Sequence, residues 1–232
     1  MNSELSGVEL ARVIQFGDSA FPVGGFSFSC GLESAIQTKL VRCVDTLREF
    51  AATSVDQAAR GDGIALIHAH RAASRGDVDA LVDIDLQVEA RKISEEARTM
   101  SSRMGRKHIE LNVHLLPSGV LQDWLGRIES GLSAGCYPVV LGAVFAIQGL
   151  PERAAFVVHQ YGVAATILGA ALRLMKVSHI DTQRILYDVN AQSEKLFQEA
   201  VGAAIDDMAG FSPEADILAA YHTKAHVRLF MS

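Results

Sequence analysis

Hydrophobic residues recur at three- to four-residue spacing along most of the chain, a period typical of amphipathic α-helices. Strand-like alternation is scarce, and the apolar run 139–147 follows Pro138, a residue that suits the first turn of a helix. We expect an all-α fold, a single-domain bundle of about nine or ten helices over residues 1–232 with a flexible C-terminal tail from about residue 210. The pattern predicts helices over residues 5–16, 31–39, 46–59, 62–73, 77–86 (with an extension toward 104), 121–131, two apolar stretches opened by Pro138 and Pro151, 181–210, and a short segment from about 214.

The most apolar segment, residues 154–172, contains no Asp, Glu, Lys or Arg. A membrane-spanning helix needs about 20 predominantly apolar residues, so this segment must be tested against that alternative. It is rich in alanine and includes His159, Gln160, Tyr161 and Thr166. We therefore expect the central buried helix of a bundle, while a spanning helix would make the protein sediment with membranes.

Charge and cysteine content narrow the class of protein. A formal net charge of −6 argues against general affinity for nucleic acid or anionic membranes. The three cysteines form no C-x-x-C pair, and the first residues show no secretory pattern. We expect a cytoplasmic protein without nucleic-acid or membrane partners.

The segment 21–33 contains three glycines, one proline and three phenylalanines between two predicted helices. Pro22 disfavours helical geometry in the residue before it, and Gly24-Gly25 permits positive φ, so the first helix should end here. Most loops are polar, whereas this one carries three aromatic rings. We expect it to be packed against something, as a structural loop or a partner-facing one.

Candidate catalytic chemistry is sparse. There is no P-loop or G-x-G-x-x-G sequence, and residues 25–29 lack the final glycine and the preceding strand of a G-x-S-x-G nucleophile elbow. His222 and His226 are weak metal-ligand candidates because their i,i+4 spacing places both rings on one helix face. We predict no catalytic residue, although a helical enzyme with a cofactor pocket around His159, Gln160 and Tyr161 remains an alternative.

Two further segments are candidate contact surfaces. The basic cluster over residues 91–107 is interspersed with Glu and fits a solvated helix face or a partner surface. The chain ends in Arg228-Leu229-Phe230-Met231-Ser232. Three large apolar side chains at a chain end require a host pocket, either on the same domain or on another protein.

The two end motifs together resemble the UreF family of urease accessory proteins. The family's opening pattern, close to P-[IV]-G-[AG]-[FY]-[ST]-x-S-x-G-L-E, matches residues 22–33, and its ending, close to F-S-P-x-x-D-I followed by R-L-F-x-S, matches residues 211–232. The chain departs from the family at Phe26, often tyrosine, at Tyr221 and Thr223 around His222, and near Ser178, where a glycine is expected.

The resemblance implies an all-helical, dimeric, cytosolic chaperone of urease maturation with no catalysis and no stably bound cofactor. Its implied partners are the accessory protein UreD (also called UreH), the GTPase UreG and apo-urease, with nickel binding and insertion carried out by the complex. It also implies that the tail orders on UreD/UreH, and that the loop and tail recruit UreG. The implied partner-contact residues are Pro22, Gly24, Gly25, Phe26, Ser27, Gly31, Glu33, Arg228, Leu229 and Phe230.

Overall fold

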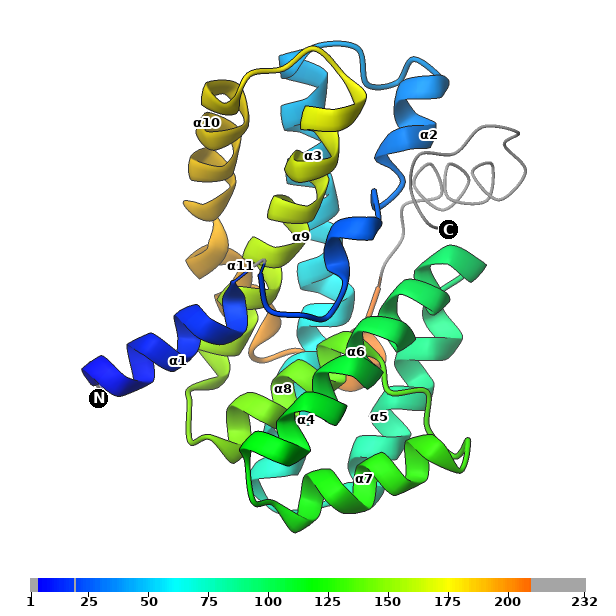
Figure 1. The fold of residues 1–232 in the computed structure, drawn as a ribbon, viewed down its shortest axis with the longest axis vertical. Coiled ribbons are helices and arrows are strands. Elements are labelled where there is room, and N and C mark those ends of the chain that lie inside the picture. Colours follow the sequence, from blue (N-terminus) through cyan, green and yellow to red (C-terminus); the bar gives the residue numbers. More distant parts are fainter. Residues whose placement is uncertain (1–3, 19, 210–232) are drawn as a thin grey trace.

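The computed structural model describes residues 4–18 and 20–209, and over these residues the chain is helical without strands (Figure 1). Nine of the helices have eleven residues or more, so the predicted all-α bundle is confirmed. The helices are α1 (Gly7–Gly17), α2 (Leu32–Gln37), α3 (Val44–Ala58), α4 (Ile64–Ser74), α5 (Val78–Arg91), α6 (Glu95–Leu115), α7 (Gly119–Glu129), α8 (Tyr137–Ile147), α9 (Glu152–Leu174), α10 (His179–Asn190) and the short α11 (Ser193–Ala200).

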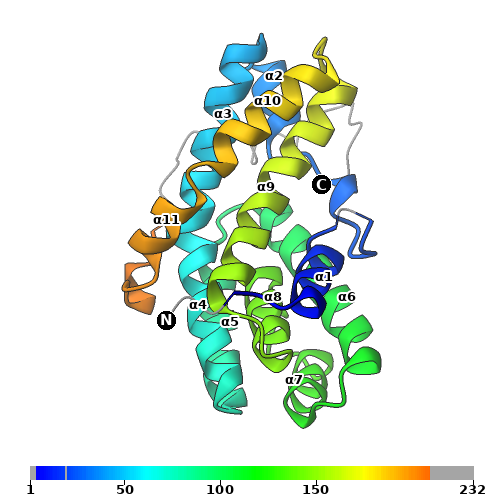
Figure 2. The ribbon, with the colours of Figure 1, turned by 90° about the vertical axis from the view of Figure 1, so that its left-hand side faces the viewer.

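Helix α9 runs through the middle of the molecule beside α3 and α4, which follow one another in a single long column (Figures 1 and 2). At one end α10 packs on α3 and α9, and at the other α8 is enclosed by α4 and α6. Gly142 allows the α4–α8 crossing to be close, because a Cβ there would lie 2.3 Å from the carbonyl oxygen of Leu66. The core therefore follows α4, α8 and α9.

Among the helices of the described residues, α9 alone is long and apolar enough to cross a membrane by length and composition. However, 56% of its most apolar window is buried inside the protein. Its neighbours include α1, α3, α4, α8, α10 and α11. These contacts support the interpretation of residues 154–172 as the core helix of the bundle.

The predicted helix end at Arg60-Gly61 is wrong, because the chain passes from α3 into α4 through a π-helical turn, Ala59–Gly63. The ring of Phe156 from α9 fills the space beside this turn, and a Cβ on Gly63 would lie 2.5 Å from that ring. The two predicted helices are thus one continuous column with a widened turn. Packing against α9 determines that the two helices are continuous, and the glycines at the turn do not reveal this continuity in the sequence.

Two other predicted boundaries also differ. The helix from residue 77 ends at Arg91, and α6 starts anew after Ser94, whose hydroxyl accepts a hydrogen bond from the amide of Ala97 at 3.1 Å. The run 181–210 is divided into α10 and α11, and α10 begins at a Ser178–Asp181 capping box. The predicted tail from residue 210 lies outside the described residues.

Buried Asp85 fixes the loop that leads into α8. Its carboxylate accepts hydrogen bonds from the Ser133 hydroxyl at 2.5 Å and from the amides of Gly135 and Cys136 at 2.7 and 2.6 Å. Helix α6 passes so near this loop that a Cβ on Gly105 would lie 2.0 Å from the Gly135 oxygen. Close packing therefore explains why residue 105 is a glycine. The hydrogen bonds of Asp85 position Tyr137 at the start of α8.

Candidate functional site

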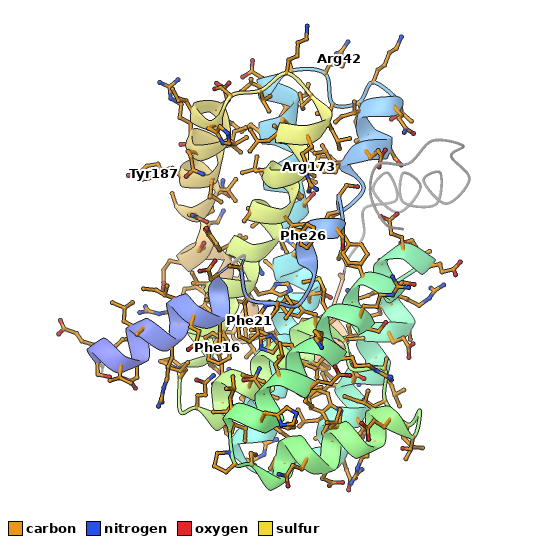
Figure 3. All side chains as sticks on the ribbon, in the orientation of Figure 1. Phe16, Phe21, Phe26, Arg42, Arg173 and Tyr187 are labelled. Atoms are coloured by element: carbon orange, nitrogen blue, oxygen red, sulfur yellow. The ribbon has the colours of Figure 1, made fainter. Side chains whose placement is uncertain are left out.

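The aromatic loop, residues 21–31, is held by two of its three phenylalanine rings. The ring of Phe21 lies 5.1 Å from Phe16 and 5.1 Å from His108 between ring centroids, and Phe28 is only 2% exposed. The ring of Phe26, in contrast, is 74% exposed (Figure 3). The expectation that the loop is packed is confirmed, and the packing leaves one aromatic side chain in solvent.

Glycines and two hydrogen bonds fix the backbone around Phe26. Gly24 and Gly31 have φ of +81° and +79°, a left-handed geometry that L side chains rarely adopt. The Ser27 hydroxyl donates to the carbonyl of Gly24 at 2.8 Å, and the Arg173 guanidinium at the end of α9 donates to the carbonyl of Phe26 at 2.8 Å. Phe26 is therefore presented on a constrained turn.

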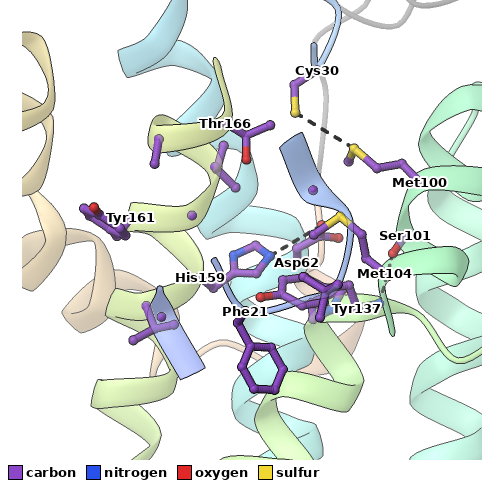
Figure 4. A pocket seen from close by; sticks show the side chains of 18 of the residues that line it. Phe21, Cys30, Asp62, Met100, Ser101, Met104, Tyr137, His159, Tyr161 and Thr166 are labelled. Atoms are coloured by element: carbon purple, nitrogen blue, oxygen red, sulfur yellow. Dashed lines mark hydrogen bonds and ion pairs between the residues drawn. The ribbon is translucent and has the colours of Figure 1, made fainter. Parts of the chain in front are cut away.

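A cavity of about 150 Å³ lies beneath the loop, bounded by the end of α1, the π-turn, α6, α8 and α9 (Figure 4). Its exposed lining residues, Asp18, Phe26 and Tyr161, mark the rim. The sequence-predicted pocket near His159 and Tyr161 is therefore present, although the buried side chain of Gln160 does not line it. Apolar side chains make up most of the wall, among them Phe16, Phe21, Val23, Met100, Met104, Val158 and Val163.

Three polar side chains from separate elements meet in this cavity. Lys92, at the break between α5 and α6, donates to both carboxylate oxygens of Asp62 at 2.8 and 2.9 Å. His159 of α9 places Nε2 at 3.9 Å from the Asp62 carboxylate and stacks on the ring of Tyr137 with a centroid distance of 6.2 Å. Asp62 belongs to the π-turn, a geometry frequent at functional sites.

Burial and charge set the protonation of this cluster. Burial acts to raise the pKa of Asp62 and to lower that of Lys92, but their mutual attraction outweighs it, so the pKa of Asp62 is lowered and that of Lys92 is raised. Burial lowers the pKa of His159 against the opposing pull of Asp62. Near pH 7 the cavity therefore contains a charged pair beside a neutral imidazole.

The model of the UreF family matches residues 41–190 of this chain. The chain belongs to the UreF family of urease accessory proteins. It is 52% identical to urease accessory protein UreF 2 of Brucella canis over 223 residues, which cover 96% of this chain and 92% of the relative. It is 49% identical to urease accessory protein UreF of Yersinia enterocolitica over 222 residues, which cover 96% and 97%.

Sequence reasoning identified the loop of this UreF-family chain but missed the polar cluster beneath it. Gly61-Asp62-Gly63 looks like a helix stop, and Lys92 looks like one more residue of a solvated basic face. One sequence signal could have indicated the cluster: Gly61 and Gly63 flank Asp62 between two helical patterns that are otherwise continuous.

The predicted contact residues fall into two groups. Within the loop, Pro22 and Phe26 are exposed, Gly24, Gly25 and Ser27 shape the turn, and Gly31 precedes α2. Glu33 is 5% exposed in the first turn of α2, where a helix dipole favours an acid. Arg228, Leu229 and Phe230, together with the weak metal candidates His222 and His226, lie outside the described residues.

Proposed function

We propose that this UreF-family chain is a non-enzymatic scaffold in urease maturation. In this proposal it joins UreD/UreH and recruits the GTPase UreG in the cytoplasm, as a homodimer, so that the complex inserts nickel into apo-urease. The chain itself holds no stable cofactor, and nickel is cargo of the assembly. Relatives named urease accessory protein, about half identical over nearly the whole chain, support the proposal.

The observation that carries the proposal in this molecule is the exposed ring of Phe26. Soluble proteins tolerate single exposed apolar residues, but this one is presented by a backbone held at Gly24, Ser27 and Arg173. Binding to a rigid, pre-shaped loop loses less conformational entropy than binding to a flexible one. The constrained, solvent-exposed aromatic ring is therefore suited to contact with a protein partner.

The alternative, a helical cofactor-binding enzyme, has the cavity near His159 and Tyr161 in its favour. Sites for drug-sized ligands and cofactors usually measure about 300–1,000 Å³. The cavity here is about 150 Å³, which is too small to enclose such a molecule. Native mass spectrometry of the purified protein tests the alternative, because an enzyme of this kind should retain a small molecule.

The test of the scaffold is complementation of a urease operon that lacks its own UreF gene. We expect this chain to restore nickel-dependent urease activity and to co-purify with UreD/UreH and UreG. Phe26→Ala should reduce co-purification. The matched control is Tyr187→Ala, which removes another aromatic side chain, 80% exposed on α10 and distant from the loop (Figure 3). Failure of the wild-type chain to restore activity contradicts the scaffold role, and equal effects of the two variants contradict the role of the loop.

A further inference from the structure

The polar cluster in the cavity contains two polar groups that are not hydrogen-bonded to each other. The Nε2 atom of His159 and an oxygen of Asp62 face each other at 3.9 Å, too far apart for a direct hydrogen bond. The other ring nitrogen of His159, Nδ1, lies 3.4 Å from the amide nitrogen of Gln160, and in the tautomer in which Nδ1 accepts from that amide the imidazole proton lies on Nε2. A donor and an acceptor therefore point at the same space.

One oxygen atom bridges such a gap, because it can lie about 2.9 Å from both heavy atoms. That oxygen must accept from the imidazole N–H and donate to the carboxylate, and a hydroxyl group does both. His159 is only 4% exposed, so the group that fills the gap enters through the cavity.

The dimensions of the cavity specify what carries the hydroxyl. A cavity of about 150 Å³ accommodates one six-membered aromatic ring. Its walls are aromatic and aliphatic, with Phe21 and Tyr137 among them. Asp62 and Lys92 neutralise each other and the third charged lining residue, Asp18, lies at the exposed rim, so the inner part of the cavity offers no net charge to a charged head group. The combination fits an apolar ring with a neutral hydroxyl.

We propose that this cavity receives one tyrosine side chain of a partner protein, with its hydroxyl bridging His159 and Asp62. The inference rests on the proposed function, which makes this face of the molecule a partner surface. The cavity opens beside Phe26, so a protein that contacts the loop can also insert a side chain. Tyrosine is enriched among the residues that dominate binding energy at protein interfaces.

The first experiment uses 4-methylphenol, which reproduces the tyrosine side chain, as a probe for the full-length chain. Toluene is the matched probe without the hydroxyl. Titrations followed by NMR chemical shifts should show 4-methylphenol binding about tenfold more tightly, because only the hydroxyl can form hydrogen bonds to both His159 and Asp62. Equal affinities, or no binding of 4-methylphenol, would overturn the proposal.

Substitutions at two glycines of α9 provide a variant that fills the cavity and its control. Gly162 lines the cavity and Gly169 does not, and a Cβ at either position meets no atom within 4 Å. Gly162→Leu should abolish binding of 4-methylphenol, whereas Gly169→Leu should leave it unchanged. Both variants replace a helical glycine with a better helix former, so both should melt at or above the wild-type temperature.

Co-purification with the urease accessory proteins separates this inference from the proposed function. If the wild-type chain binds the partners, Gly162→Leu should weaken that binding and Gly169→Leu should not. Retention of every partner by Gly162→Leu would show that the cavity takes a free phenolic molecule and would refute the partner tyrosine. If the wild-type chain binds no partner while 4-methylphenol still binds, both the proposed function and the partner tyrosine are refuted. In that case only the preference of the cavity for a phenol is supported.

Discussion

Replacing Lys92 with methionine should destabilise the protein by leaving a carboxylate without its counter-charge. The side chains of Lys92 and Asp62 are 14% and 28% exposed, so the pair is largely removed from water. Breaking a buried pair by removing one partner costs about 3–5 kcal/mol. Because Asp62 retains some contact with solvent through the cavity, we expect the lower end, a loss of about 3 kcal/mol in the free energy of unfolding at pH 7.

The pH dependence of this loss tests its cause. In the wild type the pKa of Asp62 is lowered, so the stability it contributes is present above its unfolded pKa of about 4 and is lost as the pH falls through the folded value. In Lys92→Met, only the weaker pull of His159 still opposes burial, and burial raises that pKa above the unfolded value. The folded carboxyl then takes up a proton on acidification, and the difference from wild type should shrink between pH 7 and pH 5.

Urea unfolding followed by circular dichroism measures these free energies. Lys195→Met is the control, because Lys195 is 79% exposed and lies 3.8 Å from Glu199, and its loss should change stability by no more than about 0.5 kcal/mol. A double variant, Asp62→Leu/Lys92→Met, removes both charges and should lie within about 1 kcal/mol of wild type. A loss below about 1 kcal/mol for Lys92→Met at pH 7, or a loss that grows toward pH 5, would refute the reasoning.

Three further outcomes are expected. Gly105→Ala should lower the free energy of unfolding by about 3 kcal/mol and the melting temperature with it, because its Cβ would lie 2.0 Å from the backbone oxygen of Gly135. The control, Gly126→Ala in the open middle of α7, should raise the free energy of unfolding by about 1 kcal/mol. Similar shifts in melting temperature for the two variants would contradict this. Deletion of residues 210–232 should preserve the helical circular dichroism spectrum and abolish co-purification with UreD/UreH. Arg228→Ala should weaken recruitment of UreG without unfolding the chain, and unchanged co-elution of all three proteins would reject it.

The helical elements were predictable because their signals are local. Apolar spacing and helix-breaking residues such as Pro117 and Pro151 indicated most of the helices and their connections. The aromatic loop was also recognisable as packed, since phenylalanines are unusual in a solvated turn. Which ring projects was not predictable, because Phe21 is held by His108 of α6 and by Phe16 of α1, and the sequence does not show that these segments meet.

The cavity could be anticipated only in part. His159 and Tyr161 stood out as polar residues in an apolar helix, and both line it. Asp62 and Lys92 are thirty residues apart in sequence, and neither has a local feature that predicts their pairing. The π-turn that brings Asp62 to Lys92 is stabilised by packing against α9, which no local pattern encodes.

The π-turn and the ion pair are both unusual features for the core of a helical protein. A π-turn departs from the preferred helical geometry, and a buried ion pair is often no more stable than apolar residues of similar volume. Both features occur at one place, around Asp62 in the cavity under the aromatic loop. Departures of this kind are expected at binding sites rather than in cores that serve packing alone.

This argument predicts that stability and recognition separate in the double variant Asp62→Leu/Lys92→Met. The variant should unfold at nearly the same urea concentration as wild type, because it removes both charges together. It should also lose the tighter binding of 4-methylphenol relative to toluene, since no carboxylate remains to accept from the hydroxyl. If the variant keeps that preference, Asp62 is not the acceptor; if it unfolds far more readily, the ion pair serves the stability of the fold.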